Sequence, residues 1–189
     1  MTKRKAITLI TLISLVTFGI LYLMDRNIVC ECGYIKLWHS AVISSENSQH
    51  IFDWYSLTHF IHGLAFYLIL VIVEKVLKTK IPVLSKLVIA VIMACGWEIL
   101  ENSDYVINRY RTATISLDYF GDSIINSAGD ILAMSLGFWF ANKRPVWQSA
   151  VIFFTIEIFL LLAIRDNLLI NIIMLVRPIE ALKLWQNGG

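Results

Sequence analysis

The sequence predicts an all-α, polytopic membrane protein with about five transmembrane helices and a cytoplasmic N-terminus. Of its 189 residues, 58% are hydrophobic and only 16% are charged, whereas an ordinary soluble domain is about 45–50% apolar and about 25% charged. The mean hydropathy is +0.70. The net charge of +2 is too small to attract nucleic acid. The composition therefore excludes a disordered chain, a nucleic-acid-binding domain and a conventional cytosolic enzyme, and it makes the lipid bilayer the expected partner.

The first predicted span covers residues 6–24, which contain no charged residue. A transmembrane helix needs roughly 20 mostly apolar residues, and this stretch meets that length. The basic start Lys3-Arg4-Lys5 resembles the beginning of a signal peptide, but no small-residue cleavage site follows the apolar run. We therefore expect an uncleaved signal anchor.

Four further spans follow, at residues 57–73, 82–100, 121–141 and 145–164. They must be helices, because a segment in lipid has to satisfy its own backbone hydrogen bonds. The last is strongly apolar except for Glu157, for which we expect a structural role. No repeat or flexible linker interrupts the chain, so residues 1–189 are predicted to form a single membrane domain.

The tail, residues 165–189, contains an apolar stretch at 168–176 that is too short to span the bilayer upright. We expect this tail to lie on the membrane surface or to re-enter the membrane in part.

The distribution of Lys and Arg predicts the orientation, because cytoplasmic loops carry an excess of these residues. Nine of them lie before the first span or beside the connections after the second and fourth: Lys3, Arg4, Lys5, Lys75, Lys78, Lys80, Lys86, Lys143 and Arg144. The longer loops 25–56 and 101–120 hold only four: Arg26, Lys36, Arg109 and Arg111. Both long loops are therefore predicted to be extracytoplasmic.

With this topology, the unusual polar residues of three spans gather at the extracytoplasmic end of the bundle. Ionisable groups within spans are costly and usually face the bundle interior. Residues spaced i, i+3 or i, i+4 share one face of a helix. Three sets have this spacing: His59 and His62; Glu98 and Glu101; Asp122, Asn126 and Asp130. We predict that they line a polar pocket facing the extracytoplasmic surface.

Residue chemistry suggests roles in this pocket. The candidate catalytic residues are a histidine acid/base or ligand with carboxylate partners: His59, His62, Glu98, Glu101 and Asp122. The candidate substrate-binding residues are two arginines that would clamp a phosphate or carboxylate, with three polar neighbours: Arg109, Arg111, Asn102, Asn126 and Asp130. An enzyme of this kind would be a hydrolase or transferase acting on a lipid or envelope-precursor headgroup. The alternative is a non-enzymatic protein that binds a lipid or a partner, and a transporter comes third.

A divalent metal is one option for the same pocket, with His59, His62 and Glu98 as candidate ligands. Imidazole and carboxylate groups one turn apart can chelate a metal from a single helix. The pattern is neither the Glu-x-x-His of di-iron bundles nor the His-Glu-x-x-His of zinc proteases. Metal-free acid/base chemistry and ligand binding alone therefore stay open beside it.

The outer loops carry two further features. The polar stretch Ser44–His50 is predicted to be exposed, and the tryptophans and tyrosines of the loops suggest an interfacial aromatic belt. Cys30 and Cys32, only one residue apart, are open to several uses: an exposed dithiol, a metal ligand pair, a bond to another chain, or a disulfide to Cys95. A disulfide between the two would close a very tight ring, and we do not predict a redox function.

Residues 57–141 resemble the VanZ-like membrane proteins. The stretch Asp122-Ser-Ile-Ile-Asn126-Ser-Ala-Gly129 has their Asp-x3-Asn-x2-Gly spacing, and Gly137 matches their small helix residue. A Thr-His-Phe motif, Glu98 and an arginine precede it in the expected order. VanZ-like proteins are linked with glycopeptide resistance and surface polymers, so the resemblance implies no defined reaction.

A longer set of motifs covers most of the chain. It includes CECGY, KLWH, SSENSQH, DWYS, HFIHG, WE with EN, RYRT and DY with GD. Together these motifs resemble an uncharacterised bacterial family of multi-pass inner-membrane proteins. The resemblance implies a bacterial inner membrane and brings no assigned activity, cofactor or catalytic residue.

Overall fold

The computed structural model describes residues 1–114 and 118–188; residues 115–117 of the predicted second outer loop lie outside the described residues. The described residues form eight helices, ordered α1 (Lys3–Leu23), α2 (Ser56–Val76), α3 (Val83–Glu101), α4 (Asp104–Ala113), α5 (Ile124–Lys143), α6 (Val146–Ile164), α7 (Leu168–Val176) and α8 (Glu180–Gln186). Five of them, namely α1, α2, α3, α5 and α6, are long and apolar enough to cross a membrane. The predicted all-α class and the number of spans are confirmed.

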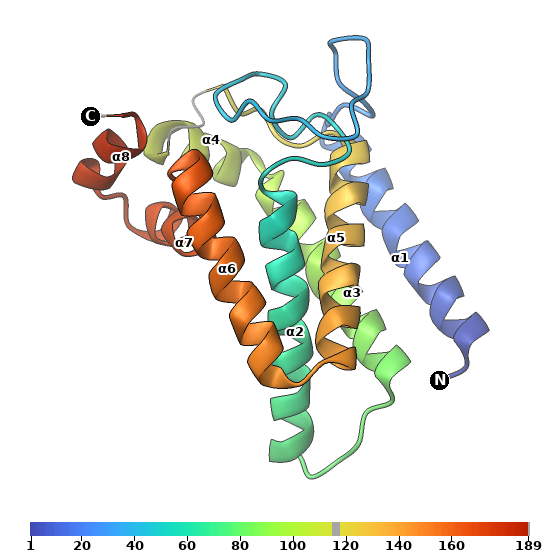
Figure 1. The fold of residues 1–189 in the computed structure, drawn as a ribbon. Coiled ribbons are helices and arrows are strands. Elements are labelled where there is room, and N and C mark those ends of the chain that lie inside the picture. The colour runs from blue at the N-terminus through green and yellow to red at the C-terminus, as the bar shows by residue number, and fades with distance from the viewer. Residues whose placement is uncertain (115–117, 189) are drawn as a thin grey trace.

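The five long helices lie side by side (Figure 1). Helices α2, α3 and α5 form the centre, where α2 and α5 make the most extensive contact. Helix α1 packs mainly on α3, and α6 packs on α2 and α5. The long 24–55 loop, α4, α7 and α8 all lie at the end of the bundle opposite the N-terminus (Figure 1). This end is called the loop end below.

Two glycines allow α2 and α5 to cross closely. A Cβ added at Gly63 would lie 2.0 Å from the carbonyl oxygen of Met134, and one added at Gly137 would lie 2.0 Å from that of Phe60. Small residues at helix contacts let backbones approach within a membrane, where packing drives association. The crossing fixes the position of α2 against α5 and therefore of the polar residues that each helix carries.

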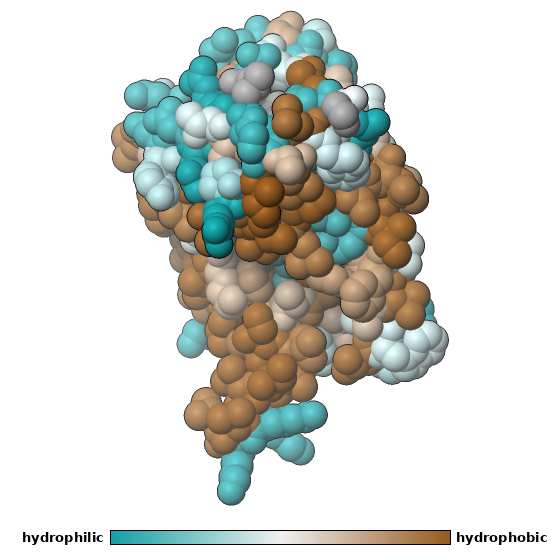
Figure 2. All heavy atoms as spheres, turned by 90° about the vertical axis from the view of Figure 1, so that its left-hand side faces the viewer, coloured by the Kyte–Doolittle hydropathy of each residue, from teal (hydrophilic) through white to brown (hydrophobic). Residues whose placement is uncertain are grey.

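The central helices bury an apolar core toward the N-terminal end of the bundle. Its buried members come from α2, α3 and α5: Leu70, Leu87, Ala90, Val91, Ala94, Cys95, Ile131, Met134 and Phe138. The outer helices instead expose large apolar side chains, such as Leu15 and Val16 of α1 and Phe154 and Leu162 of α6. Figure 2, which views the side of the molecule that carries α6, shows an apolar band below a hydrophilic cap at the loop end. Such a surface suits contact with lipid.

The loop end contains helices that the sequence reading did not predict. Helix α4 forms within the predicted loop 101–120, where the Ser103 side chain accepts a hydrogen bond from the backbone N–H of Val106 and begins the helix. The tail forms α7 and α8, and the carboxylate of Glu157 accepts from the backbone N–H groups of Leu168 and Leu169. Glu157 thus caps α7, which agrees with its expected structural role.

The start of α5 corrects one expectation. Asp122 was expected within a helix, one turn before Asn126, but α5 begins at Ile124 and Asp122 precedes it. The reason is local: Gly121 has a φ of 100°, and the side chain of the N-cap Ser123 accepts a hydrogen bond from the N–H of Asn126. Asn126 and Asp130 do share a helix.

Candidate functional site at the loop end

The loop end of α2 is fixed by a buried carboxylate. Asp53 accepts hydrogen bonds from the backbone N–H groups of Tyr55 (2.8 Å) and Ser56 (3.3 Å) at the start of the helix. Its other oxygen accepts from the backbone N–H of Ser48 at 3.0 Å. Burial raises the pKa of Asp53, and these backbone hydrogen bonds oppose that shift. Asp53 thereby positions the first turn of α2, which carries His59, and ties it to the outer loop.

His59 is the centre of the polar cluster, and it lies between carboxylates from two other helices. Its Nδ1 is 3.5 Å from Glu98 Oε1. Its Nε2 is 3.9 Å from Asp130 Oδ2 and 4.0 Å from Glu101 Oε2. His59, Glu98 and Asp130 are 6%, 0% and 3% exposed. The prediction that α2, α3 and α5 would bring these residues together therefore agrees with the geometry.

Several oxygens of this cluster lack hydrogen-bond partners. Among the described residues, both carboxylate oxygens of Glu98, Oε2 of Glu101 and Oδ1 of Asp130 are buried without one. Most buried polar atoms in proteins have a partner, so each exception needs an explanation. Carboxylates so close together repel one another unless a proton or another cation lies between them. Protons on the carboxylates, a protonated His59 or a bound cation would each relieve this repulsion.

A second layer of polar groups surrounds the cluster. Asn102 and Asp122 form a reciprocal pair: Asn102 Nδ2 donates to Asp122 Oδ2 at 2.9 Å, and the Asp122 backbone N–H donates to Asn102 Oδ1 at 2.7 Å. The Tyr119 hydroxyl donates to Asp122 Oδ1 at 3.0 Å. Burial raises the pKa of Asp122 to about 6, although the hydrogen bonds from Asn102 and Tyr119 oppose the shift. Asp122 can therefore exchange a proton near neutral pH.

A tyrosine from α4 joins this layer to the tail. The Tyr110 hydroxyl lies 3.0 Å from Glu101 Oε1 and 2.9 Å from Asn171 Oδ1. Burial, together with the charge of Glu101, raises the pKa of Tyr110 well above its ordinary value. The phenol therefore stays protonated and can donate a hydrogen bond to Glu101.

These residues border a cavity of about 30 Å³ at the loop end. A buried water needs roughly 10–15 Å³ of such space, so the cavity has room for an ion with a water, or for one small terminal group of a substrate. Its lining includes four of the predicted site residues, namely His59, Glu101, Asp122 and Asp130. The remaining lining residues come from loops and from α4 and α7: Asn47, Ser48, Tyr55, Tyr110, Tyr119 and Asn171.

Residues 47–50 of the outer loop are buried beside this cavity, which corrects the expectation of exposure for this part of Ser44–His50, whereas Ser45 is exposed. Gln49 and His50 are each only 1% exposed. Gln49 Nε2 donates to the Gly121 carbonyl at 2.7 Å, and Asn126 Nδ2 donates to the His50 carbonyl at 2.9 Å. A Cβ at Gly129 would lie 2.0 Å from the Ile51 carbonyl oxygen. The loop lies directly on α5 because its polar groups find partners there instead of in water.

Six predicted residues do not line the cavity: Glu98, Asn102 and Asn126, which were described above, and His62, Arg109 and Arg111. His62 is one turn deeper than His59, stacks on Phe66 at 5.8 Å and meets the Trp97 ring edge-on at 6.0 Å. The Arg109 guanidinium donates to the carbonyl groups of Leu175 (2.8 Å) and Val176 (3.2 Å), so it fastens α4 to the end of α7. Arg111 is exposed. The structure therefore does not bring the two arginines together as an anion clamp over the cavity.

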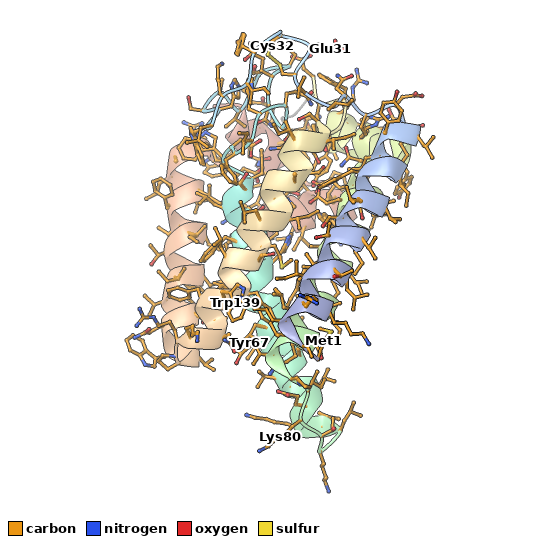
Figure 3. The ribbon with its side chains drawn as sticks, turned by 90° about the vertical axis from the view of Figure 1, so that its right-hand side faces the viewer. Met1, Glu31, Cys32, Tyr67, Lys80 and Trp139 are labelled. Atoms are coloured by element: carbon orange, nitrogen blue, oxygen red, sulfur yellow. A yellow bond between two sulfur atoms is a disulfide. The ribbon has the colours of Figure 1, made fainter. Side chains whose placement is uncertain are left out.

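The cysteines adopt a pairing that the sequence reading did not favour. Cys30 and Cys32 form a disulfide with each other, and Cys95 is free and buried. The disulfide to Cys95, one of the alternatives left open by the sequence, does not form, since Cys95 belongs to the apolar core. Cys32 and Glu31 lie at the tip of the loop end, opposite Met1 and Lys80 (Figure 3).

A second cluster of charged groups lies in the same outer loop. Glu46 accepts hydrogen bonds from Lys36 Nζ (2.9 Å) and the Tyr34 hydroxyl (2.8 Å), and its Oε2 lies 3.1 Å from His50 Nε2. Hydrogen bonds from Lys36, His50 and Tyr34 lower the pKa of Glu46 to about 2. Because Lys36 supplies the positive charge, this cluster has a structural explanation that the cluster around His59 lacks.

Comparison with known proteins finds relatives of this chain in several bacteria. A family model described as "Protein of unknown function (DUF2585)" matches residues 21–188. A UPF0314 protein of Rhizobium johnstonii is 50% identical over 167 residues, which cover 88% of this chain and 84% of that protein. A UPF0314 protein of Rhizobium meliloti is 47% identical over 188 residues (98% and 93%), and one of Paracoccus denitrificans is 49% identical over 166 residues (86% and 82%). No solved structure matches the chain.

Proposed function

The chain belongs to the DUF2585 family, and from this premise we propose that it is a bacterial inner-membrane protein whose His59 site acts on the headgroup of a lipid or cell-envelope precursor. The family description assigns no activity, so the proposal depends on the site. The resemblance of residues 57–141 to VanZ-like proteins stays a prediction and carries no part of the argument.

The observation that carries the proposal is the position of His59, whose two ring nitrogens face different carboxylates. Glu98 approaches its Nδ1, whereas Glu101 and Asp130 approach its Nε2. His59, Glu101 and Asp130 line the cavity. A carboxylate that accepts a hydrogen bond from one nitrogen fixes the tautomer and orientation of an imidazole, and this leaves the other nitrogen free to transfer a proton. Glu98 Oε1, 3.5 Å from Nδ1, is the carboxylate placed to accept such a bond. Glu98 is therefore a positioning residue, and His59 is the candidate acid/base.

The place of the site along the bundle favours a headgroup as substrate. His59 lies in the first turns of α2, and Glu98 and Glu101 lie in the last turns of α3. The ends of transmembrane helices lie near the headgroup region of the bilayer. A cavity of about 30 Å³ admits only the terminal group of such a molecule, so the reacting group would enter and the remainder would stay outside.

The small volume also favours the second candidate function, a non-enzymatic protein that holds a lipid or a partner. In that case the polar cluster would fix the loop end without chemistry. A variant that loses the acid/base group but still accumulates distinguishes the two functions. Such a variant would lose catalysis. It would keep binding, because binding depends on the shape of the outer loop.

The test of the proposed function is the lipid and envelope-polymer profile of a bacterial strain that lacks the protein, measured by mass spectrometry. We expect one precursor to accumulate, and its headgroup would identify the substrate class. A profile indistinguishable from that of the parent strain, under growth conditions in which the parent produces the protein, would contradict the proposal.

The proposed orientation places the loop end outside the cytoplasm. It is supported by the nine Lys and Arg residues of the opposite end, against four in the two long loops. Cysteine labelling of intact cells tests it, in a variant whose native cysteines are replaced by serine. Ser45 and Thr79 are both exposed, in the outer loop and the α2–α3 connection respectively. We expect a membrane-impermeant maleimide to label Ser45→Cys and to label Thr79→Cys only after the cells are lysed; the reverse pattern would invert the topology.

A further inference from the structure

The cluster around His59 has the composition and spacing of a metal site. One oxygen of Glu98, one oxygen of Asp130 and one ring nitrogen of His59 all lie within 4.8 Å of one another, and all three residues are buried. Metal–ligand bonds to such atoms are about 2.0–2.2 Å long, so two ligands of one ion lie roughly 3–4 Å apart. His59 Nδ1 and Glu98 Oε1 are 3.5 Å apart, which falls within this range. Asp130 Oδ2 is 3.9 Å from the other ring nitrogen, Nε2, so an ion bound to a single nitrogen of His59 would reach Asp130 across the wider spacing of up to 4.8 Å.

The unpartnered oxygens are an independent reason to expect an ion. Glu98 is fully buried, and within the described part of the chain neither of its oxygens has a hydrogen-bond partner. The same holds for Oδ1 of Asp130 and Oε2 of Glu101. Among the described residues, these three carboxylates form no ion pair with a Lys or Arg. The contrast is the outer-loop cluster, where Lys36 already neutralises Glu46.

We propose that His59, Glu98 and Asp130 bind a divalent transition-metal ion, with Glu101 as the nearest further ligand. The ligand set is one imidazole and carboxylate oxygens. Carboxylates favour Mg²⁺, Ca²⁺ and Mn²⁺, whereas an imidazole nitrogen favours Zn²⁺, Fe²⁺ and related ions. The mixture therefore points to Mn²⁺, Fe²⁺ or Zn²⁺. The sequence predicts His62 as a candidate metal ligand, but the His62 ring packs against Phe66 and Trp97. Asp130 is the third ligand instead.

The inference concerns the same site as the proposed function but does not depend on the substrate. An ion bound there would neutralise the carboxylates and polarise a water or a headgroup oxygen in the adjoining cavity. It would also take over the acid/base role of the His59 nitrogen that it occupies, because a ligated nitrogen cannot accept a proton. Metal content and metal-dependent stability are measured without any substrate. A metal-containing protein with no envelope phenotype would overturn only the proposed function, and a metal-free protein with the phenotype would overturn only the inference.

The test is the metal content of detergent-purified protein, measured by inductively coupled plasma mass spectrometry. We expect about one Mn, Fe or Zn per chain in the wild type and at least a tenfold reduction in the double variant Glu98→Gln/Asp130→Asn. The matched control is Glu157→Gln, because Glu157 is a buried carboxylate of α6 whose oxygens already accept backbone N–H groups. Metal retained in the double variant at the level of the control would overturn the assignment.

A second measurement applies if the double variant does not fold. Wild-type protein is stripped with a chelator and then titrated with Mn²⁺ or Zn²⁺ while its Tm is recorded. An ion that binds only the folded state raises the Tm in a concentration-dependent way. Electron paramagnetic resonance of the Mn²⁺-loaded wild type should also show that the electron spin of the ion couples to a ¹⁴N nucleus. The variant His59→Gln should lack this coupling. Metal-free wild type whose Tm is unchanged by both ions would show that protons alone neutralise the cluster.

Discussion

Replacing His59 with glutamine is expected to give the same envelope profile as deleting the protein, while the protein still accumulates. Glutamine retains hydrogen-bonding groups of similar reach but cannot transfer a proton or offer an imidazole nitrogen. General acid/base catalysis contributes about 10²–10⁴-fold to rates, so the remaining activity should be too low to prevent precursor accumulation. The measurement is complementation of the deletion strain, with the protein level followed by immunoblot.

The matched control is His39→Gln, which changes a buried histidine outside the cavity lining. His39 packs against His50 with ring centroids 5.0 Å apart and lies near Lys36 of the outer loop. We expect this variant to restore the parent profile. If His59→Gln restored it equally well at the same protein level, His59 would have no chemical role.

Replacing Gly137 with leucine is expected to cause the largest loss of folded protein. Even its Cβ would lie 2.0 Å from the Phe60 carbonyl oxygen, which belongs to the helix backbone and cannot rotate away. The two central helices would have to separate, and overpacking of this kind costs typically 1–3 kcal/mol or more. The measurement is the Tm and the monodisperse fraction in detergent by fluorescence-detected size-exclusion chromatography.

Gly96→Ala is the control for this prediction. Gly96 lies in α3, and apart from the neighbouring backbone of its own helix no heavy atom of the described residues comes within 4 Å of the Cβ position. Alanine favours a helix over glycine by up to about 1 kcal/mol, so this variant should be as stable as the wild type or slightly more stable. A Gly137→Leu variant as stable as Gly96→Ala would show that α2 and α5 do not cross as closely as described.

The helical part of the site could be predicted from the sequence. Residues His59, Glu98 and Asp130 stand out because ionisable groups are rare in apolar spans, and antiparallel connection of the spans puts them at the same end of the bundle. Helix periodicity therefore carries enough information to bring three spans together in one site. It does not tell which of His59 and His62 reaches the cavity, because the ring of His62 is directed by its packing against Phe66 and Trp97.

The loop part of the site could not be predicted. Asn47, Ser48 and Asn171 line the cavity, but polar residues in a loop carry no periodic signal, and their partners are distant in the sequence. Gln49, for example, donates to the carbonyl of Gly121. The same limit explains why Ser44–His50 was expected in water and why Arg109 was expected at the cavity instead of at the carbonyl groups of α7.

The measurement that bears most directly on the site is the envelope profile of a strain that produces Glu98→Gln at the wild-type level. Glu98 is buried, lies 3.5 Å from His59 Nδ1 and lacks a hydrogen-bond partner among the described residues, so its carboxyl group is available to His59 or to an ion. We expect the precursor to accumulate as it does in the deletion strain. Folded Glu98→Gln protein with the parent profile would mean that the cluster is structural and that the function lies elsewhere in the molecule.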